Sequence, residues 1–268
     1  MQILNRVPKS VKIKEIIVEN DMVKTFVVDF SLGARPGQFV MLWIPRLDEK
    51  PISVAMDNGS EMHFTVAAVG PFSNAMHELS VGDFVGVRGP FGTEFECDEG
   101  AHIALLAGGY GAAPLYFFAH EAVKKGAKVE FIVGARSADL VLYEERISAL
   151  DCATVHVSTD DGSKGHHGYN TQVLQELLDA GGIEAVYAVG PEIMMLKGAE
   201  AAEAAGAKAF VSVERYMKCG FGVCGNCVVD GTGDPVCLKG PVMPWEEVKK
   251  IEDFGKYHRD EFGKKHNF

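Results

Sequence analysis

The chain has 268 residues, and its 37 acidic and 26 basic side chains give a formal net charge of −11 at pH 7. Hydrophobic residues make up 47% and charged residues 24%, which is typical of a globular protein with a sizeable core and excludes a disordered or collagen-like chain. The length predicts about two domains, and an acidic chain without a run of Lys or Arg is not expected to bind nucleic acid.

The start of the chain lacks the apolar segment of a secretion signal. Residues 1–12, MQILNRVPKSVK, contain no hydrophobic run ahead of a small-residue cleavage site. Two of the longest apolar stretches, 103–109 and 185–190, fall well short of the roughly 20 residues that cross a bilayer. We therefore expect a cytoplasmic protein that does not associate with a membrane.

The first third of the chain predicts a small antiparallel β-barrel. Six β-rich runs alternate with turn signals, and only residues 73–79 have a helical pattern. Closing the six strands into a barrel would leave no exposed edge. The runs are 11–18, 23–30, 38–45, 52–56, 62–70 and 83–89.

From residue 102 the pattern changes to short apolar strands that alternate with helix-period segments. Such alternation predicts a parallel sheet covered by helices on both faces. The expected strands are 102–107, 129–134, 154–158, 185–190 and 208–214. The expected helices are 114–125, 138–150, 171–180 and 191–205.

Glycines gather where the first of these strands meets its helix. Gly108, Gly109 and Gly111 lie in the sequence AGGYGAAPL, where a nucleotide pyrophosphate can meet the positive end of a helix. Pro114 replaces the third glycine of the usual GxGxxG pattern, so a plain glycine-rich turn is the alternative. Gly190 also ends a strand, which favours a nucleotide crevice at the carboxyl edge of the sheet.

The segment between these two strand ends carries no defensible catalytic group. Residues 159–163, TDDGS, are expected to be either a plain loop or a ligand contact. His166 and His167 are expected to be loop residues. No nucleophile–base pair stands out elsewhere, and we expect no catalytic acid or base.

Four of the six cysteines lie within 19 residues of one another, and their spacing is the most specific signal in the chain. Cys219, Cys224, Cys227 and Cys237 are separated by four, two and nine residues. A spacing of four followed by two is typical of a loop around a 2Fe-2S cluster. A structural zinc site is the alternative, although zinc more often takes two short hooks separated by a longer loop.

Cys97 and Cys152 stand alone and are expected to be buried apolar residues. The charged tail, residues 245–268, is expected to be a solvated helix or a docking extension, with a functional site as the alternative.

The order of the three parts resembles the ferredoxin reductase superfamily over almost the whole chain. The resemblance implies an FAD-binding barrel at 1–99, an NAD-binding α/β domain at 100–213, and a 2Fe-2S module with a tail at 214–268. In that superfamily an Arg-x-x-Ser or Arg-Pro-x-Ser motif holds FAD. The matching residues are Lys50, Pro51, Ile52 and Ser53, with lysine in place of arginine. Lysine offers phosphate a point charge where arginine offers a planar fork.

The same resemblance assigns further cofactor contacts. Thr65, Val66 and Ala67 would flank the flavin, and Phe72 and Ser73 would meet its pyrophosphate. From the residues alone, ordinary barrel packing would explain these five positions. The four clustered cysteines would be the cluster ligands. The nucleotide contacts implied are Gly108, Gly109, Gly111 and Gly190, with Tyr110 standing where a smaller residue is expected.

One family within the superfamily matches best, on GGxGxAP, TDDGSxG, VGPEIMM and MKCGFGVCGNC. The chain is similar to the electron-transfer subunit of class 1B dihydroorotate dehydrogenase. The resemblance implies an oxidoreductase subunit of pyrimidine biosynthesis that relays electrons through FAD and 2Fe-2S between NAD and an FMN-containing catalytic partner, in a heterotetramer. NAD is expected as co-substrate by family alone, because Arg136 could meet a 2′-phosphate or be a surface residue.

A related group has the same three parts. It contains the small subunit of NADH-dependent ferredoxin:NADP oxidoreductase or sulfide dehydrogenase. There an aspartate is expected among the cluster ligands, so four cysteines favour the dihydroorotate subunit. A zinc-stabilised interaction module with a vestigial nucleotide fold is a third possibility.

Overall fold

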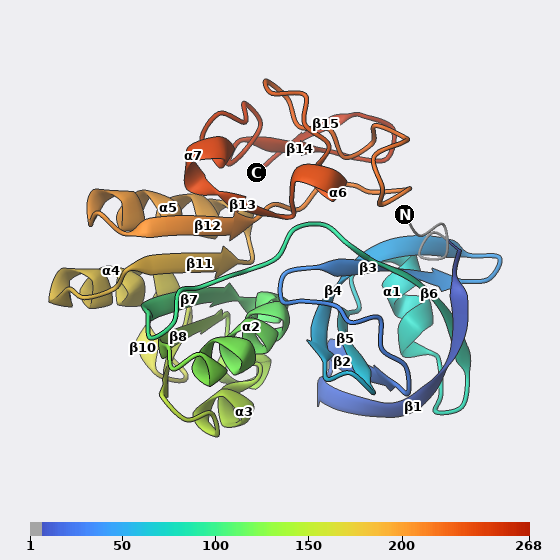
Figure 1. Cartoon of the computed structure of the whole chain (residues 1–268), viewed down its shortest axis with the longest axis horizontal. Coiled ribbons are helices and arrows are strands. Elements are labelled where there is room, and N and C mark those ends of the chain that lie inside the picture. The colour runs from blue at the N-terminus through green and yellow to red at the C-terminus, as the bar shows by residue number, and fades with distance from the viewer. Residues whose placement is uncertain (1–6) are drawn as a thin grey trace.

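The computed structural model describes residues 7–268. It places a closed β-barrel beside a parallel sheet, and a C-terminal module lies over both (Figure 1). The first six residues, which belong to the expected range 1–99 and to the start of the chain discussed above, lie outside the described residues. No helix within residues 7–268 is long and apolar enough to span a membrane.

The predicted six-stranded antiparallel barrel is confirmed. Its strand order is β1-β2-β5-β4-β3-β6, and α1 (Pro71–His77) follows β5. Alternate residues point inward, so that Phe26, Leu42 and Phe64 are buried in its core. The strands are β1 (Lys9–Asn20), β2 (Val23–Val28), β3 (Phe39–Ile44), β4 (Asp48–Asp57), β5 (Met62–Ala67) and β6 (Phe84–Phe91).

The predicted parallel sheet is also confirmed, in the order β10-β9-β8-β7-β11-β12-β13. Helix α2 (Ala112–Lys124) packs on one face with α3 (Glu144–Ser148), while α4 (Asn170–Ala180) and α5 (Glu192–Ala204) cover the other. The predicted parallel strands are β7 (His102–Gly108), β8 (Lys128–Ala135), β9 (Ala153–Thr159), β11 (Ala185–Val189) and β12 (Lys208–Ser212).

Two strands of the sheet were not predicted. His166 and His167, expected in a loop, form the short parallel edge strand β10 (His166–His167) beside β9. At the other edge, β13 (Val242–Pro244) comes from the C-terminal module and pairs antiparallel with β12. The sheet and this module therefore share backbone hydrogen bonds.

The expected helix at 138–150 is wrong in one respect, because it is broken. A 3₁₀ turn η3 (Ala138–Leu140) and α3 flank Tyr143, which has a left-handed backbone with φ of 65°. The hydroxyl of Tyr143 lies 2.6 Å from the hydroxyl of Thr65 in the barrel. The helix is thus interrupted at the residue that makes this buried contact between the sheet domain and the barrel.

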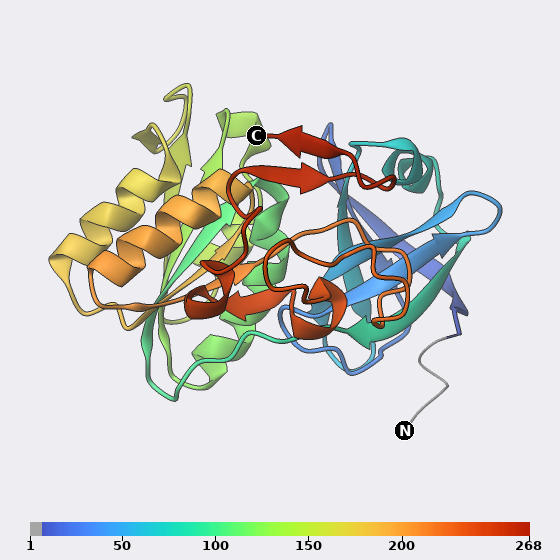
Figure 2. The same cartoon turned by 90° about the horizontal axis from the view of Figure 1, so that it is seen from above.

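The C-terminal module contains little regular structure. Its elements are α6 (Val236–Lys239), β13, α7 (Trp245–Val248) and a hairpin of β14 (Tyr257–Arg259) and β15 (Lys265–Asn267). The tail is thus a one-turn helix followed by a hairpin, and the expected solvated helix is wrong. Viewed from above, the hairpin runs across the region between the barrel and the sheet (Figure 2).

The two isolated cysteines differ from expectation in part. Cys97 is half-buried and packs against the core beside α2, as expected for an apolar residue. Cys152 is exposed, in a turn where its φ is 61°, so its expected burial is wrong. The turn before β9 leaves its side chain in solvent.

Candidate functional site

A cavity of 340 Å³ opens between the barrel, α1 and the start of α2. We call it the barrel cavity. Its volume lies in the range of about 300–1,000 Å³ that is typical of cofactor sites. All nine residues that the resemblance assigned to FAD line it: Lys50, Pro51, Ile52, Ser53, Thr65, Val66, Ala67, Phe72 and Ser73.

Lys50 is a cation that lines the barrel cavity and is held in place by two side chains. Its Nζ lies 2.8 Å from Asp48 Oδ2 and donates a hydrogen bond of 2.8 Å to the hydroxyl of Tyr216. Burial lowers the pKa of Lys50, but these hydrogen bonds outweigh burial and raise it above its ordinary value. The residue therefore stays charged at neutral pH and can attract an anion.

Two hydroxyls of the barrel cavity are already engaged within the protein. Thr65 bonds to Tyr143 and to Thr25, whose hydroxyl is 2.8 Å away. Ser73 Oγ accepts hydrogen bonds from the N–H groups of Val69 and Gly70. Both side chains shape the cavity wall, and neither is free to contact a ligand without giving up a partner.

A larger cavity of 1030 Å³ follows the carboxyl edge of the parallel sheet. We call it the sheet-edge cavity. Gly108, Gly109 and Gly190 line it, and the first and last of these approach each other closely. A Cβ on Gly190 would lie 2.8 Å from the Cα of Gly108, so only glycine fits. Two strand ends thus meet without side chains, as a crevice for a nucleotide requires.

Gly111 is separated from the other three glycines. It lines the barrel cavity, and a Cβ there would lie 2.3 Å from the carbonyl oxygen of Val189. The structure therefore gives Gly111 a packing role between the start of α2 and β11. Three of the four glycines thus line the sheet-edge cavity, and Gly111 lines the barrel cavity.

Tyr110 and Glu214 line both cavities, and sequence reasoning did not identify Glu214. The negative charge of Glu214, together with burial, raises the pKa of Tyr110 to about 12. Glu214 lies two residues after the end of β12, so the rule that ligands meet the carboxyl ends of parallel strands was the signal that could have found it.

The segment 159–163 is an ordered turn, and only its Asp160 lines the sheet-edge cavity. Asp161 accepts hydrogen bonds from the N–H and the hydroxyl of Ser163, which folds the turn. Arg136 also lines this cavity, one residue after β8. Neither His166 nor His167 lines either cavity.

The four clustered cysteines are free thiols, and each interacts with at least one of the others. The thiol of Cys224 interacts with the sulfur of Cys219, and the thiol of Cys227 interacts with that of Cys237. Backbone N–H groups of Gly222 and Val223 point at Cys237 and Cys219, with N···Sγ distances of 3.2 and 3.3 Å.

This arrangement fits a two-iron cluster. Such a cluster takes four cysteine thiolates, and N–H donors to sulfur stabilise it. In the described part of the chain, no three His, Cys, Asp or Glu side chains gather closely enough to hold one metal ion.

Arg88 joins the cysteine loop to the barrel, a role that was not predicted from the sequence. It is 6% exposed, and its guanidinium forms a fork to Glu49 with two contacts of 2.5 Å. The same guanidinium donates to the carbonyl oxygen of Cys219. Gly220 of the same loop also packs on the barrel, because a Cβ there would lie 3.1 Å from Met41 of β3. The loop is thus fixed directly on the barrel wall.

Comparison with known proteins agrees with this geometry. Residues 214–249 match the iron-sulfur cluster binding domain of dihydroorotate dehydrogenase B, and residues 105–200 match an oxidoreductase NAD-binding domain. A relative from Methanocaldococcus jannaschii, named dihydroorotate dehydrogenase B (NAD(+)), electron transfer subunit, is 45% identical and is matched over 96% of this chain and 98% of its own.

Two further proteins extend the comparison. A relative of the same name from Methanothermobacter thermautotrophicus is 42% identical over 97% of both chains. The fold is similar to a solved structure of an NADH-dependent reduced ferredoxin-NADP oxidoreductase, with a TM-score of 0.81, 28% identity, and coverage of 91% of this chain and 93% of that chain.

Proposed function

The chain belongs to the family of dihydroorotate dehydrogenase B (NAD(+)) electron transfer subunits, and from this we propose that it carries electrons between a dihydroorotate-oxidising partner and NAD. FAD, a 2Fe-2S cluster and NAD are the cofactors of this function. The single observation that supports it most is that one short stretch of chain leads from the barrel cavity to the first of the clustered cysteines. Residues 212–215 and Met217 line the barrel cavity, and the chain reaches Cys219 two residues later.

The residues present fit the three groups. We assign FAD to the barrel cavity, where Lys50 supplies positive charge for phosphate and residues of β4 and β5 form the wall. Cys219, Cys224, Cys227 and Cys237 would hold the cluster. Gly108, Gly109 and Gly190 would let a dinucleotide approach the backbone of the sheet-edge cavity.

Bound FAD supplies hydride exchange with a nicotinamide and one-electron exchange with an iron-sulfur cluster. The protein's own residues keep the two cavities in contact. Five residues line both cavities and form their common boundary: Ala67, Val69, Tyr110, Glu214 and Arg215. Thr65 and Tyr143 fix the barrel to the sheet domain through a 2.6 Å hydrogen bond. No side chain is needed as an acid or base, because a hydride carries its own electrons.

The partner is proposed to be an FMN-containing dihydroorotate dehydrogenase catalytic subunit, in a cytoplasmic heterotetramer. The ranges 1–99, 100–213 and 214–268 remain our proposed functional units. The test is anaerobic purification of the native protein with whatever binds it. We expect a co-purifying FMN protein that oxidises dihydroorotate and passes electrons to NAD only when this chain is present. A colourless chain without a reducible cluster would refute the proposal.

A second function is favoured by the structural likeness to the ferredoxin-NADP oxidoreductase. In that case the chain would serve as the small subunit of an NADH-dependent ferredoxin:NADP oxidoreductase or a sulfide dehydrogenase. Recovery of a large ferredoxin-reducing flavoprotein in place of the FMN protein would select it.

A further inference from the structure

The C-terminal hairpin forms a wall of the sheet-edge cavity, although it is far in sequence from the glycine loops. His258, Arg259 and Asp260 of the hairpin line the cavity, and Phe268 follows β15 and lines it too. None of the four lines the barrel cavity. These four residues therefore line the sheet-edge cavity outside the stretch that it shares with the barrel cavity.

The wall that the hairpin presents is aromatic. The ring of His258 lies 5.3 Å from the ring of Phe268, tilted by 40°, and stacks at 5.5 Å on the ring of His266. His258 is exposed and Phe268 is 56% exposed, so both rings are open to a ligand. Arg259 lies in the same wall, with its guanidinium paired with Asp230 at 2.7 Å.

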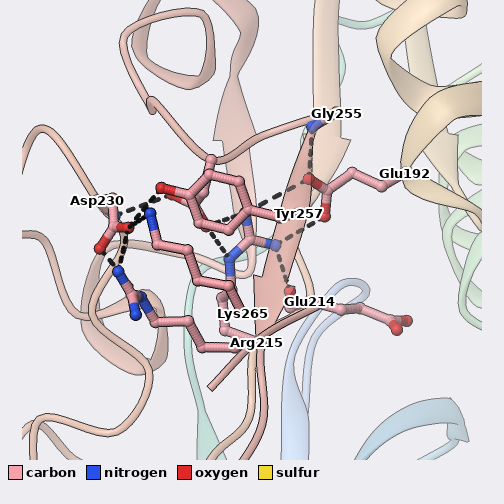
Figure 3. Close-up of polar contacts among 9 residues, drawn as sticks. Glu192, Glu214, Arg215, Asp230, Gly255, Tyr257 and Lys265 are labelled. Carbon is pink, nitrogen blue, oxygen red and sulfur yellow. Dashed lines mark hydrogen bonds and ion pairs between the residues drawn. The ribbon is translucent and has the colours of Figure 1, made fainter. Parts of the chain in front are cut away.

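A polar network fixes this wall to both the nucleotide loop and the cysteine loop. Asp230, three residues after Cys227, accepts a 2.6 Å hydrogen bond from the hydroxyl of Tyr257 and lies 3.8 Å from Lys265 Nζ (Figure 3). The N–H of Asp230 donates to Asp253. The network thus begins at the hairpin and enters the module.

The other half of the network reaches the sheet edge. Asp253 binds Arg215, which in turn binds Glu192 at 2.7 Å at the start of α5. Glu192 also accepts a 2.6 Å hydrogen bond from the N–H of Gly255, ahead of the hairpin (Figure 3). The side chains of Arg215 and Asp253 are each 4% exposed. Groups this buried and fully paired hold a fixed geometry.

The position of the wall identifies the part of the ligand that it meets. A nicotinamide that exchanges hydride with a flavin must lie at the boundary of the two cavities, beside Tyr110 and Glu214. The pyrophosphate belongs at the glycine loops, where backbone N–H groups are available. The adenine base is the one remaining planar ring of a dinucleotide, and aromatic side chains bind bases by stacking.

We propose that His258 and Phe268 form the binding surface for the adenine base of the nicotinamide dinucleotide, and that Asp230 is a positioning residue that holds this surface in place. The inference rests on the proposed function, since it assumes that NAD binds in the sheet-edge cavity. The tail is accordingly part of the nucleotide site.

The test compares ligands with and without the adenosine half. Calorimetry on the full chain with its cofactors gives the Kd of NAD+ and of nicotinamide mononucleotide for wild type, Phe268→Ala, His258→Ala and Asp230→Ala. We expect each variant to raise the Kd of NAD+, by about tenfold for Phe268→Ala, which is the scale of one base stack. The Kd of the mononucleotide should stay unchanged. KM for NADH should rise with kcat unchanged.

A matched control is available on the same hairpin. Phe262 is 88% exposed and does not line the cavity, so Phe262→Ala should bind NAD+ as wild type does. Unchanged NAD+ binding in both Phe268→Ala and His258→Ala would overturn the inference, and so would equal weakening of NAD+ and the mononucleotide. A wild-type protein that binds the mononucleotide but neither binds nor oxidises NADH would overturn the proposed function with it.

Discussion

The guanidinium of Arg88 in β6 donates a 2.6 Å hydrogen bond to the main-chain oxygen of Cys219. One buried cation thus connects the barrel, whose strands line the barrel cavity, to the first residue of the cysteine loop. Its Nε–H and Nη2–H groups bond to Glu49 and to the carbonyl oxygen of Lys218. The position of the loop relative to the barrel is therefore set by a buried group that bonds to both.

Arg88→Ala should destabilise the protein strongly. The substitution leaves Glu49 without its partner in a largely buried site, and loss of one member of such a pair costs about 3 kcal/mol. Urea unfolding followed by circular dichroism measures the change in the free energy of unfolding. Arg35→Ala is the control, because its ion pair with Glu94 has a 66% exposed arginine side chain and should contribute less than about 1 kcal/mol. Similar losses in the two variants would contradict this account.

Cys224→Ser should remove the visible absorbance of the cluster while FAD is retained. A serine hydroxyl is a poor replacement for a thiolate ligand to iron, whereas the barrel cavity contains no part of the residue. Iron and flavin content of the anaerobically purified protein provide the measurement. Cys152→Ser serves as the comparison, since that exposed thiol lies in a turn before β9. If iron were unchanged in Cys224→Ser, the ligand assignment would be wrong.

Local sequence patterns predicted the barrel strands, the alternating strands and helices of the sheet domain, and a site at the clustered cysteines. Each of these patterns involves residues that are close in sequence. The features that escaped prediction depend on distant partners. The helix expected at 138–150 breaks at Tyr143, whose hydroxyl bonds to Thr65, 78 residues away. The tail becomes a hairpin where Tyr257 reaches Asp230, 27 residues earlier. Arg88 likewise acts on a loop 131 residues away, which no periodicity reveals.

Glu130→Gln should lower stability at neutral pH without affecting nucleotide binding. Glu130 lies on β8 near the amino end of the sheet, opposite the cavities. Its carboxylate accepts hydrogen bonds from His156 and His102 at 2.8 and 3.1 Å and pairs with Lys128 at 3.0 Å. Burial raises the pKa of Glu130, but these contacts outweigh burial and lower it to about 2. The glutamine variant should lose about 2 kcal/mol at pH 7, allowing for screening by solvent.

This difference should depend on pH in one direction. Because the folded-state pKa lies below the ordinary 4.5, the stabilisation is complete above pH 4.5 and is lost as pH falls toward 2. Urea unfolding of both proteins between pH 7 and pH 2 measures the gap, and the comparison cancels any acid loss of the cluster. A gap that stays constant over this range would disprove the role of the carboxylate charge.

Lys50→Ala should weaken FAD binding, and Lys50→Arg should preserve or strengthen it. The lysine lies at the wall of the barrel cavity, with its ammonium held by Asp48 and Tyr216. Loss of one partly screened charge-assisted contact to phosphate should raise the Kd of FAD by about tenfold. Arginine offers two parallel N–H donors in place of a point charge. Quenching of flavin fluorescence on titration of the apoprotein measures each Kd.

Lys14→Ala is the control, because that lysine lies on β1, pairs with Glu61 and does not line the cavity. Equal FAD affinity in Lys50→Ala and wild type would mean that residue 50 makes no contact with the cofactor, and that the departure from arginine at this position has no effect on binding.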